Sequence, residues 1–161
     1  RSIKNGSRKE LVKAVELSDK LLRATINKDE STVAEIIGEA HQANTSPKFY
    51  NNEQALRSVV IMAYLSSVDD YIRFEELASG KGYIDLLFLP ALQSSKPALI
   101  IELKWNKSAE KAIQQEQDQQ YWKFAKQFRY KGKILLVGIN YNSKTKKHTC
   151  KIKEIESLEK N

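Results

Sequence analysis

The stretch GYIDLLFLPALQSSKPALIIELK, residues 82–104, contains the two segments that decide the fold. Residues 83–89 and 98–104 are short, apolar and rich in β-branched or aromatic side chains, which predicts two strands. The loop between them begins and ends with proline, which favours a break in regular structure. The second segment begins apolar on both faces, so we expect its strand at the centre of a sheet.

Three charged side chains interrupt these apolar strands. Asp85 lies in the first strand, and Glu102 and Lys104 close the second. Residues two apart on a strand share a face, so Glu102 and Lys104 point to the same side. Burying an unpaired charge is costly, so some compensation must exist. Either Glu102 pairs with Lys104 or another residue, or a cation lies between Asp85 and Glu102.

The second alternative corresponds to a known kind of chemistry. Two carboxylates, together with water and a phosphate oxygen, suit Mg²⁺ or Mn²⁺. Such an ion polarises a phosphodiester and helps to ionise a water molecule. Lys104 could orient that water or stabilise the charge that builds on phosphorus. The pattern therefore predicts a metal-dependent phosphodiesterase.

Helical periodicity surrounds the strands. Apolar residues recur every three to four positions in the first third of the chain and again in residues 51–67, which predicts two leading helices and a third. Residues 71–74 and 134–139 predict further strands, residues 108–128 one long helix, and residues 148–155 a half-polar edge strand. Behind two leading helices, the order is helix, three strands, helix and two strands. This order predicts a mixed α/β sandwich.

Composition excludes several classes of protein. The 161 residues suffice for one ordinary domain, and 41% hydrophobic with 29% charged residues excludes a wholly disordered chain. No apolar run approaches the roughly 18 residues of a membrane helix, so no membrane partner is expected. The single cysteine, Cys150, excludes an internal disulfide and fits a cytoplasmic location. His41 and His148 lie too far apart in sequence to suggest a ligand pair.

The net charge of +7 permits a polyanionic partner, although a merely charged surface explains it equally. A basic stretch with interleaved aromatic residues follows position 122, and a second lysine cluster follows position 143. If either flanks the acidic site, it becomes a track for a phosphate backbone. The lysines that we expect to contact nucleic acid are Lys81, Lys107, Lys123 and Lys126.

Two motifs carry a resemblance to a known family. Gly80-Lys81-Gly82-Tyr83-Ile84-Asp85 and Ile101-Glu102-Leu103-Lys104 resemble the motifs of the PD-(D/E)XK nuclease superfamily. More narrowly, the chain is similar to the DUF1703-type module at the C-terminus of bacterial AAA-ATPase-like proteins. The resemblance implies a restriction-endonuclease-like α/β core, αβββαβ, at residues 49–161 behind an N-terminal helical extension at residues 1–48.

The resemblance also implies roles for individual residues. Asp85 and Glu102 would hold Mg²⁺ or Mn²⁺, Lys104 would be the catalytic lysine, and Glu53 would be an acid on the preceding helix that supports the site. For Glu53, a simple favourable interaction with the helix dipole remains an alternative. DNA is the implied partner, together with an ATPase-like domain. The sequence has no P-loop, so we do not expect this chain to bind ATP, and no small-molecule cofactor is expected.

The helix after the second motif leaves one question open. Gln115 and Tyr121 match the supporting glutamine and tyrosine of the family, yet Gln117 and Tyr121 share a helix face by spacing. The chain departs from the family at Tyr83, where arginine is usual, and at Glu116, where an apolar residue is usual. The alternative function is therefore a catalytically inactive module of the same fold that binds nucleic acid or a partner protein.

Overall fold

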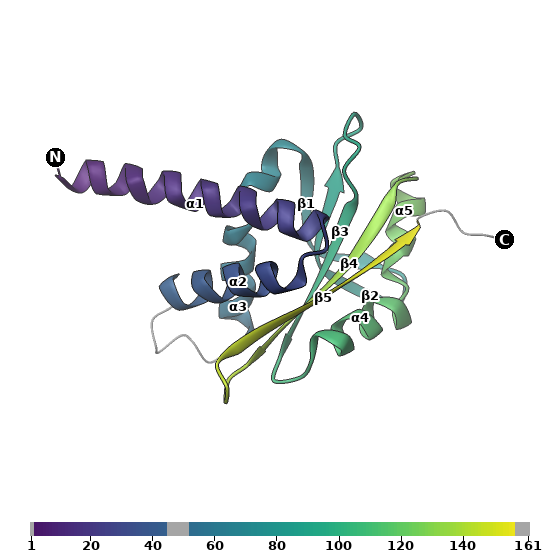
Figure 1. Cartoon of the computed structure of the whole chain (residues 1–161). Coiled ribbons are helices and arrows are strands. Elements are labelled where there is room, and N and C mark those ends of the chain that lie inside the picture. The colour runs from purple at the N-terminus through teal and green to yellow at the C-terminus, as the bar shows by residue number, and fades with distance from the viewer. Residues whose placement is uncertain (1, 45–51, 157–161) are drawn as a thin grey trace.

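The computed structural model describes residues 2–44 and 52–156 (Figure 1). Within these residues, five strands and several helices follow one another. In order, they are α1 (Ser2–Ile26), α2 (Glu30–Asn44), α3 (Glu53–Ala63), the 3₁₀ helix η1 (Leu65–Asp69), β1 (Tyr71–Ser79), β2 (Gly82–Pro90), β3 (Ala98–Trp105), α4 (Ala109–Asp118), the 3₁₀ helix η2 (Tyr121–Lys123), α5 (Phe124–Gln127), β4 (Lys133–Asn142) and β5 (Lys147–Glu156).

The strands form one mixed sheet in the order β1-β2-β3-β4-β5. Neighbouring strands are antiparallel except β3 and β4, which run parallel. A parallel pair needs a crossover connection, and the helical segment from α4 to α5 supplies it. The central strand β3 is buried along its first six residues, as its apolar sequence predicts. The predicted mixed α/β sandwich is therefore confirmed.

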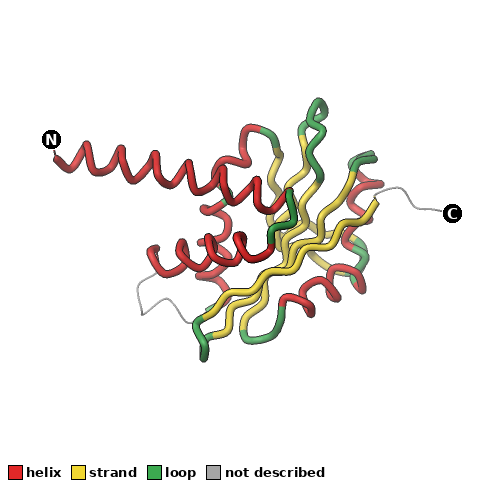
Figure 2. The backbone as a smooth tube through the Cα atoms, viewed as in Figure 1, coloured by secondary structure: helices red, strands yellow, loops and turns green. Residues whose placement is uncertain are grey.

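Helices cover both faces of the sheet (Figures 1 and 2). On one face, α1, α2 and α3 pack against a core that includes Leu99, Ile101 and Val137. On the other face, η2 and α5 pack with α4 against a second core that includes Ile100 and Leu136. Alternate residues of β3 thus serve opposite cores, which explains why its sequence is apolar on both faces.

The third helix is shorter than predicted. It begins at Glu53, because the Asn52 side chain caps it by accepting a hydrogen bond from the Ala55 backbone N–H at 2.7 Å. It ends at Ala63, and the 3₁₀ helix η1 continues the chain to β1. The prediction of one helix over residues 51–67 was therefore wrong at its C-terminal end, and position 51 lies outside the described residues.

The predicted long helix at residues 108–128 is wrong, because the helix breaks after α4. Gln120 adopts a left-handed backbone conformation, with φ of 57°. The turn between β1 and β2 packs against this break, and a Cβ atom at Gly80 would lie 2.2 Å from the Gln119 carbonyl oxygen. Lys81 donates its backbone N–H to the same carbonyl at 2.8 Å. A contact with a distant hairpin thus accompanies the interruption of the helix.

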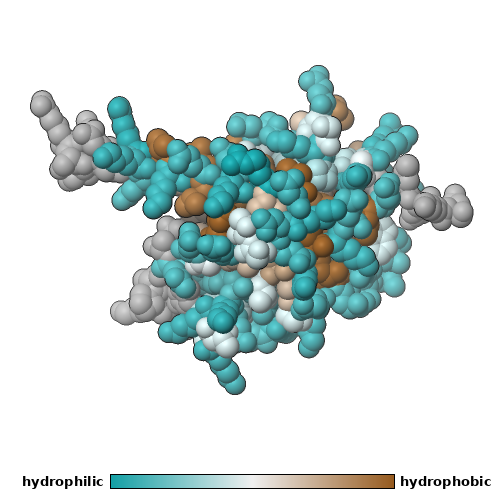
Figure 3. All heavy atoms as spheres, in the orientation of Figure 1, coloured by the Kyte–Doolittle hydropathy of each residue, from teal (hydrophilic) through white to brown (hydrophobic). Residues whose placement is uncertain are grey.

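One end of α1 extends beyond the sheet and shows apolar side chains on its surface (Figure 3). Leu11 and Val12 are more than half exposed, and Val15 is 39% exposed. They precede Ser18, the first buried position among the described side chains of the helix. Within the described ranges, no helix combines the length and apolar composition that crossing a membrane requires.

Candidate functional site

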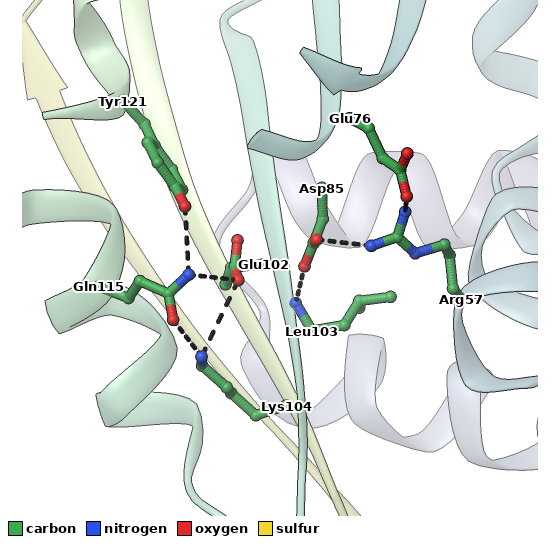
Figure 4. Close-up of polar contacts among 8 residues, drawn as sticks. All are labelled: Arg57, Glu76, Asp85, Glu102, Leu103, Lys104, Gln115 and Tyr121. Atoms are coloured by element: carbon green, nitrogen blue, oxygen red, sulfur yellow. Dashed lines mark hydrogen bonds and ion pairs between the residues drawn. The ribbon is translucent and has the colours of Figure 1, made fainter. Parts of the chain in front are cut away.

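The site lies where β2 and β3 separate. The antiparallel ladder between them ends at the pair Leu86 and Ile101. One step further along each strand stand Asp85 and Glu102, so the divergence of the strands places two carboxyl groups at the opening. The Leu103 backbone N–H donates a hydrogen bond to Asp85 Oδ2 at 3.0 Å (Figure 4). Asp85 therefore occupies a position where the strand ladder would otherwise continue.

Glu102 is the more buried of the two acids, with 4% of the residue exposed. Burial is the main cause that raises its pKa to about 9, and the nearby Asp85 charge acts in the same direction. The Lys104 charge opposes them. Glu102 Oε2 has no hydrogen-bond partner among the described residues. At neutral pH, the side chain of Glu102 therefore carries a proton, which allows two acids to lie side by side.

A single glutamine joins the other members of the site. Gln115 Nε2 donates to Glu102 Oε1 at 2.8 Å and to the Tyr121 hydroxyl at 3.1 Å. Gln115 Oε1 accepts a hydrogen bond from Lys104 Nζ, which lies 4.0 Å from Glu102 Oε1 (Figure 4). The break after α4 brings Tyr121 to Gln115. Helical spacing, which favoured Gln117, does not apply across that break.

Arg57 is part of the site, although the sequence did not point to it. Its Nη2 atom donates to Asp85 Oδ1 at 2.7 Å, and its Nη1 atom donates to Glu76 Oε1 at 2.7 Å. It lies on α3, one helical turn after Glu53. That spacing from a predicted site residue was the one available indication. Glu53 itself is exposed, and its charge contributes to raising the pKa of Glu102.

Glu116 is a second residue whose importance emerges from the structure. It is fully buried on α4, next in sequence to Gln115. Burial, followed by the charges of Glu102 and Asp85, raises the pKa of Glu116 well above its ordinary value. The charges of Glu102 and Asp85 thus act on the buried Glu116 carboxyl and disfavour its ionisation.

The four candidate lysines do not form one patch. Lys81 and Lys123 line a common hollow of about 400 Å³ beside the β1–β2 turn. Lys107 follows β3 and lines a different hollow, of about 900 Å³, between α2 and β5. Lys126 is exposed on α5. The structure thus brings together two of the four, Lys81 and Lys123.

The comparison with protein families agrees with this geometry. The family model described as the PD-(D/E)XK nuclease superfamily matches residues 51–151, which is more than half of the chain. The chain belongs to the PD-(D/E)XK nuclease superfamily. The matched segment runs from the start of α3 into β5 and includes every member of the site described above. Among curated proteins, none matches the chain.

Membership gives the fold and a general activity. The mixed five-stranded sheet with flanking helices is a restriction-endonuclease-like α/β fold. A domain of the PD-(D/E)XK superfamily indicates a nuclease-type function, and nucleases of this superfamily generally use divalent metal ions and bind nucleic acid.

The residues present fit a hard divalent ion in part. Among the described residues, no cluster of three or more His, Cys, Asp or Glu side chains is arranged to hold a metal. Two carboxylates do suffice for Mg²⁺, which keeps several water ligands and also binds substrate phosphate. Asp85 and Glu102 supply these two groups, and the Oε2 atom of Glu102 has no hydrogen-bond partner among the described residues. Glu102 would release its proton on binding the ion, because a carboxyl group ligates a metal in its ionised form. The donor set therefore suits Mg²⁺ or Mn²⁺ and lacks the nitrogen and sulfur ligands that other metals prefer.

Proposed function

We propose that this domain hydrolyses phosphodiester bonds in DNA with the help of Mg²⁺ or Mn²⁺. The observation that carries the proposal is the meeting of Asp85 and Glu102 at the separation of β2 and β3, with Lys104 joined to Glu102 through the Gln115 amide. Membership of the superfamily supports a nuclease-type activity. Two carboxyl groups that can ligate a hard metal ion and one lysine ammonium group thus lie together on neighbouring strands.

Each residue has a distinct role in this proposal. Asp85 and Glu102 would hold the ion, which would supply positive charge to the scissile phosphate and help to ionise a water molecule. Lys104 orients the attacking water and stabilises the negative charge that builds on the phosphate. Glu53, exposed on the first turn of α3, is a supporting acid whose charge acts on the Glu102 carboxyl.

Gln115 and Tyr121 position the reacting groups. The Gln115 amide contacts Lys104 and Glu102 at once, so it fixes the distance between the ammonium group and the carboxyl group. The Tyr121 hydroxyl accepts from the same amide, and burial raises the pKa of Tyr121 to about 12, so the hydroxyl stays protonated at neutral pH. Together they orient the Gln115 amide so that its oxygen faces Lys104.

The basic surface is the proposed contact for the nucleic-acid backbone. Lys81 and Lys123 flank one hollow near the β1–β2 turn, while Lys107 and Lys126 extend the positive charge elsewhere. Contacts of this type release counterions, so affinity for DNA falls as salt rises.

The wider context is also a proposal. The similarity to the DUF1703-type module suggests a C-terminal position in a larger AAA-ATPase-like protein, with residues 1–48 as a helical extension and residues 49–161 as the nuclease-like domain. Such a protein would act on DNA in the cytoplasm. The motifs of residues 80–85 and 101–104 support this placement.

The decisive experiment is a cleavage assay with a matched carboxylate control. The parent protein is incubated with linear and circular DNA in Mn²⁺ or Mg²⁺, beside Asp85→Asn, Lys104→Met and Asp118→Asn. Asp118 is an exposed acid on α4 outside the network, so its variant should cleave as the parent does. We expect the first two variants and a chelator to reduce the rate at least ~100-fold. Equal rates in Asp85→Asn and the parent would refute the proposal.

One observation favours a second candidate function. Lys104 contacts Gln115 and lies near Glu102, and Arg57 already neutralises Asp85. Such an internally compensated network suits a module of the same fold that binds nucleic acid or a partner protein without cleaving. DNA binding that weakens with salt, is unaffected by chelator and leaves the DNA intact would identify it.

A further inference from the structure

Arg57 joins a carboxylate of the site to a carboxylate at the surface (Figure 4). It donates to Asp85 and to Glu76 over equal distances of 2.7 Å. The side chains of Arg57 and Asp85 are only 16% and 15% exposed, whereas that of Glu76 is 69% exposed. The guanidinium therefore has one partner in a partly dry site and a second partner in contact with water.

The backbone of β1 is irregular at Glu76, the second partner of Arg57. The pairs Glu75–Leu86 and Leu77–Ile84 belong to the β1–β2 ladder, while Glu76, which lies opposite Asp85, is left out of it. Glu76 has φ of 52°, a left-handed conformation that is uncommon for residues with a side chain and energetically unfavourable. The irregularity lies at the position where the Glu76 carboxylate meets Arg57.

A guanidinium at this position opposes the binding of a metal ion. A guanidinium group does not lose its charge in proteins, so an arginine can relieve repulsion only by moving. Arg57 and an ion on Asp85 would share one carboxylate, and two positive charges so close repel strongly in a partly desolvated site. The exposed Glu76 carboxylate offers Arg57 a place to remain when it leaves Asp85.

We propose that Arg57 is an internal counter-ion that sets the metal affinity of the site by shifting from Asp85 to Glu76 when a divalent ion binds. This inference rests on the proposed function, because it assumes that Asp85 is a metal ligand. Arg57 acts through Asp85 and is therefore a positioning residue. Substitutions of Arg57 and of Glu76 must consequently change metal affinity in opposite directions.

The test is a calorimetric titration with Mn²⁺ of the parent, Arg57→Gln, Glu76→Gln and the double variant. Arg57→Gln keeps a donor for Asp85 and removes the charge, so we expect Mn²⁺ to bind about tenfold more tightly. Glu76→Gln removes the alternative partner, and we expect binding about threefold weaker. In the Arg57→Gln background, the Glu76 substitution should have little further effect, because there is no charge left to relocate.

A matched control removes a cation elsewhere. Lys96 forms a 2.7 Å ion pair with Asp70, a partner outside the site, and Lys96→Gln should leave Mn²⁺ affinity unchanged. Glu76 is exposed, so its variant tests the inference even if Arg57→Gln fails to fold. Unchanged or weaker binding in Arg57→Gln, unchanged binding in Glu76→Gln, or no Mn²⁺ binding by any variant would overturn the inference.

The two hypotheses fail in different ways. If the protein cleaves DNA and loses cleavage in Asp85→Asn, yet Arg57→Gln leaves Mn²⁺ affinity unaltered, the proposed function stands and the counter-ion role of Arg57 is wrong. If Arg57→Gln and Glu76→Gln shift Mn²⁺ affinity in opposite directions but the parent never cleaves DNA, the counter-ion role stands and the proposed nuclease activity is wrong.

Discussion

The Glu102→Gln substitution should stabilise the metal-free protein, and increasingly so as pH rises. In the folded protein the pKa of Glu102 is about 9, against an ordinary value of 4.5, because burial and then the Asp85 charge disfavour ionisation. Because the pKa of Glu102 is higher in the folded than in the unfolded chain, protonated Glu102 makes its full contribution to the free energy of unfolding below pH 4.5. That contribution is lost as pH rises toward 9, because the unfolded chain releases the proton first.

The magnitude follows from the width of this window. Each pH unit between the two values is worth about 1.4 kcal/mol, so the loss reaches about 3 kcal/mol at pH 7 and about 6 kcal/mol near pH 9. A glutamine side chain in place of Glu102 cannot ionise. Its carbonyl oxygen can still accept the hydrogen bond from Gln115.

The assay is urea unfolding at several pH values between about pH 5 and 9, with EDTA present to keep the protein free of metal. The free energy of unfolding of Glu102→Gln minus that of the parent should be near zero at the acidic end and should grow with pH. Glu75→Gln, at an exposed position on β1, is the matched control and should show no such trend. A difference that stays constant with pH, or that falls as pH rises, would refute the reasoning.

Two further predictions concern packing and acid stability. A Cβ atom at Gly138 would lie 2.5 Å from the Ala109 carbonyl oxygen and 2.8 Å from the Ala112 Cβ atom, so Gly138→Ala should push α4 away from β4 and destabilise the fold by about 1–3 kcal/mol in thermal or urea unfolding. An unchanged midpoint would contradict this close packing. His41 Nδ1 and His148 Nε2 lie 2.8 Å apart, and burial, followed by the charge of His41, lowers the pKa of His148 from 6.5 to about 4. As pH falls from 6.5 toward 4, the unfolded state therefore takes up a proton before the folded state does. The free energy of unfolding should fall by about 1–2 kcal/mol over this range, allowing for solvent screening. His148→Gln should reduce this loss, and a pH profile identical to that of the parent would exclude His148 as its cause.

The central position of β3 in the sheet was predictable from sequence. The run at residues 98–104 is apolar on both faces, and such a strand must be covered on both sides, which places it centrally. The alternation of side chains along a strand also placed Glu102 and Lys104 on one face. Strand lengths were less predictable: β1 extends to Ser79, well past the predicted residue 74, because its pairing with β2 continues beyond its most apolar segment.

The helix after β3 shows where local reasoning fails. Nothing in residues 108–128 required a break, since the segment contains no proline or glycine. The interruption at Gln120 lies against the β1–β2 turn, about forty residues away in the chain, and packing of this kind overrides helix propensity. Across this break, Gln115 meets Tyr121, and not Gln117 as helical spacing favoured.

The sequence by itself determined the mixed α/β architecture and the candidate acids and lysine of the site, because apolar periodicity and charge inside a strand are local properties of the chain. The tertiary structure decided which groups those side chains meet. Arg57 reaches Asp85 from α3, and His41 meets His148 across α2 and β5. Such pairings depend on how separate helices pack against the sheet, and neither the spacing nor the composition of the chain contains that information.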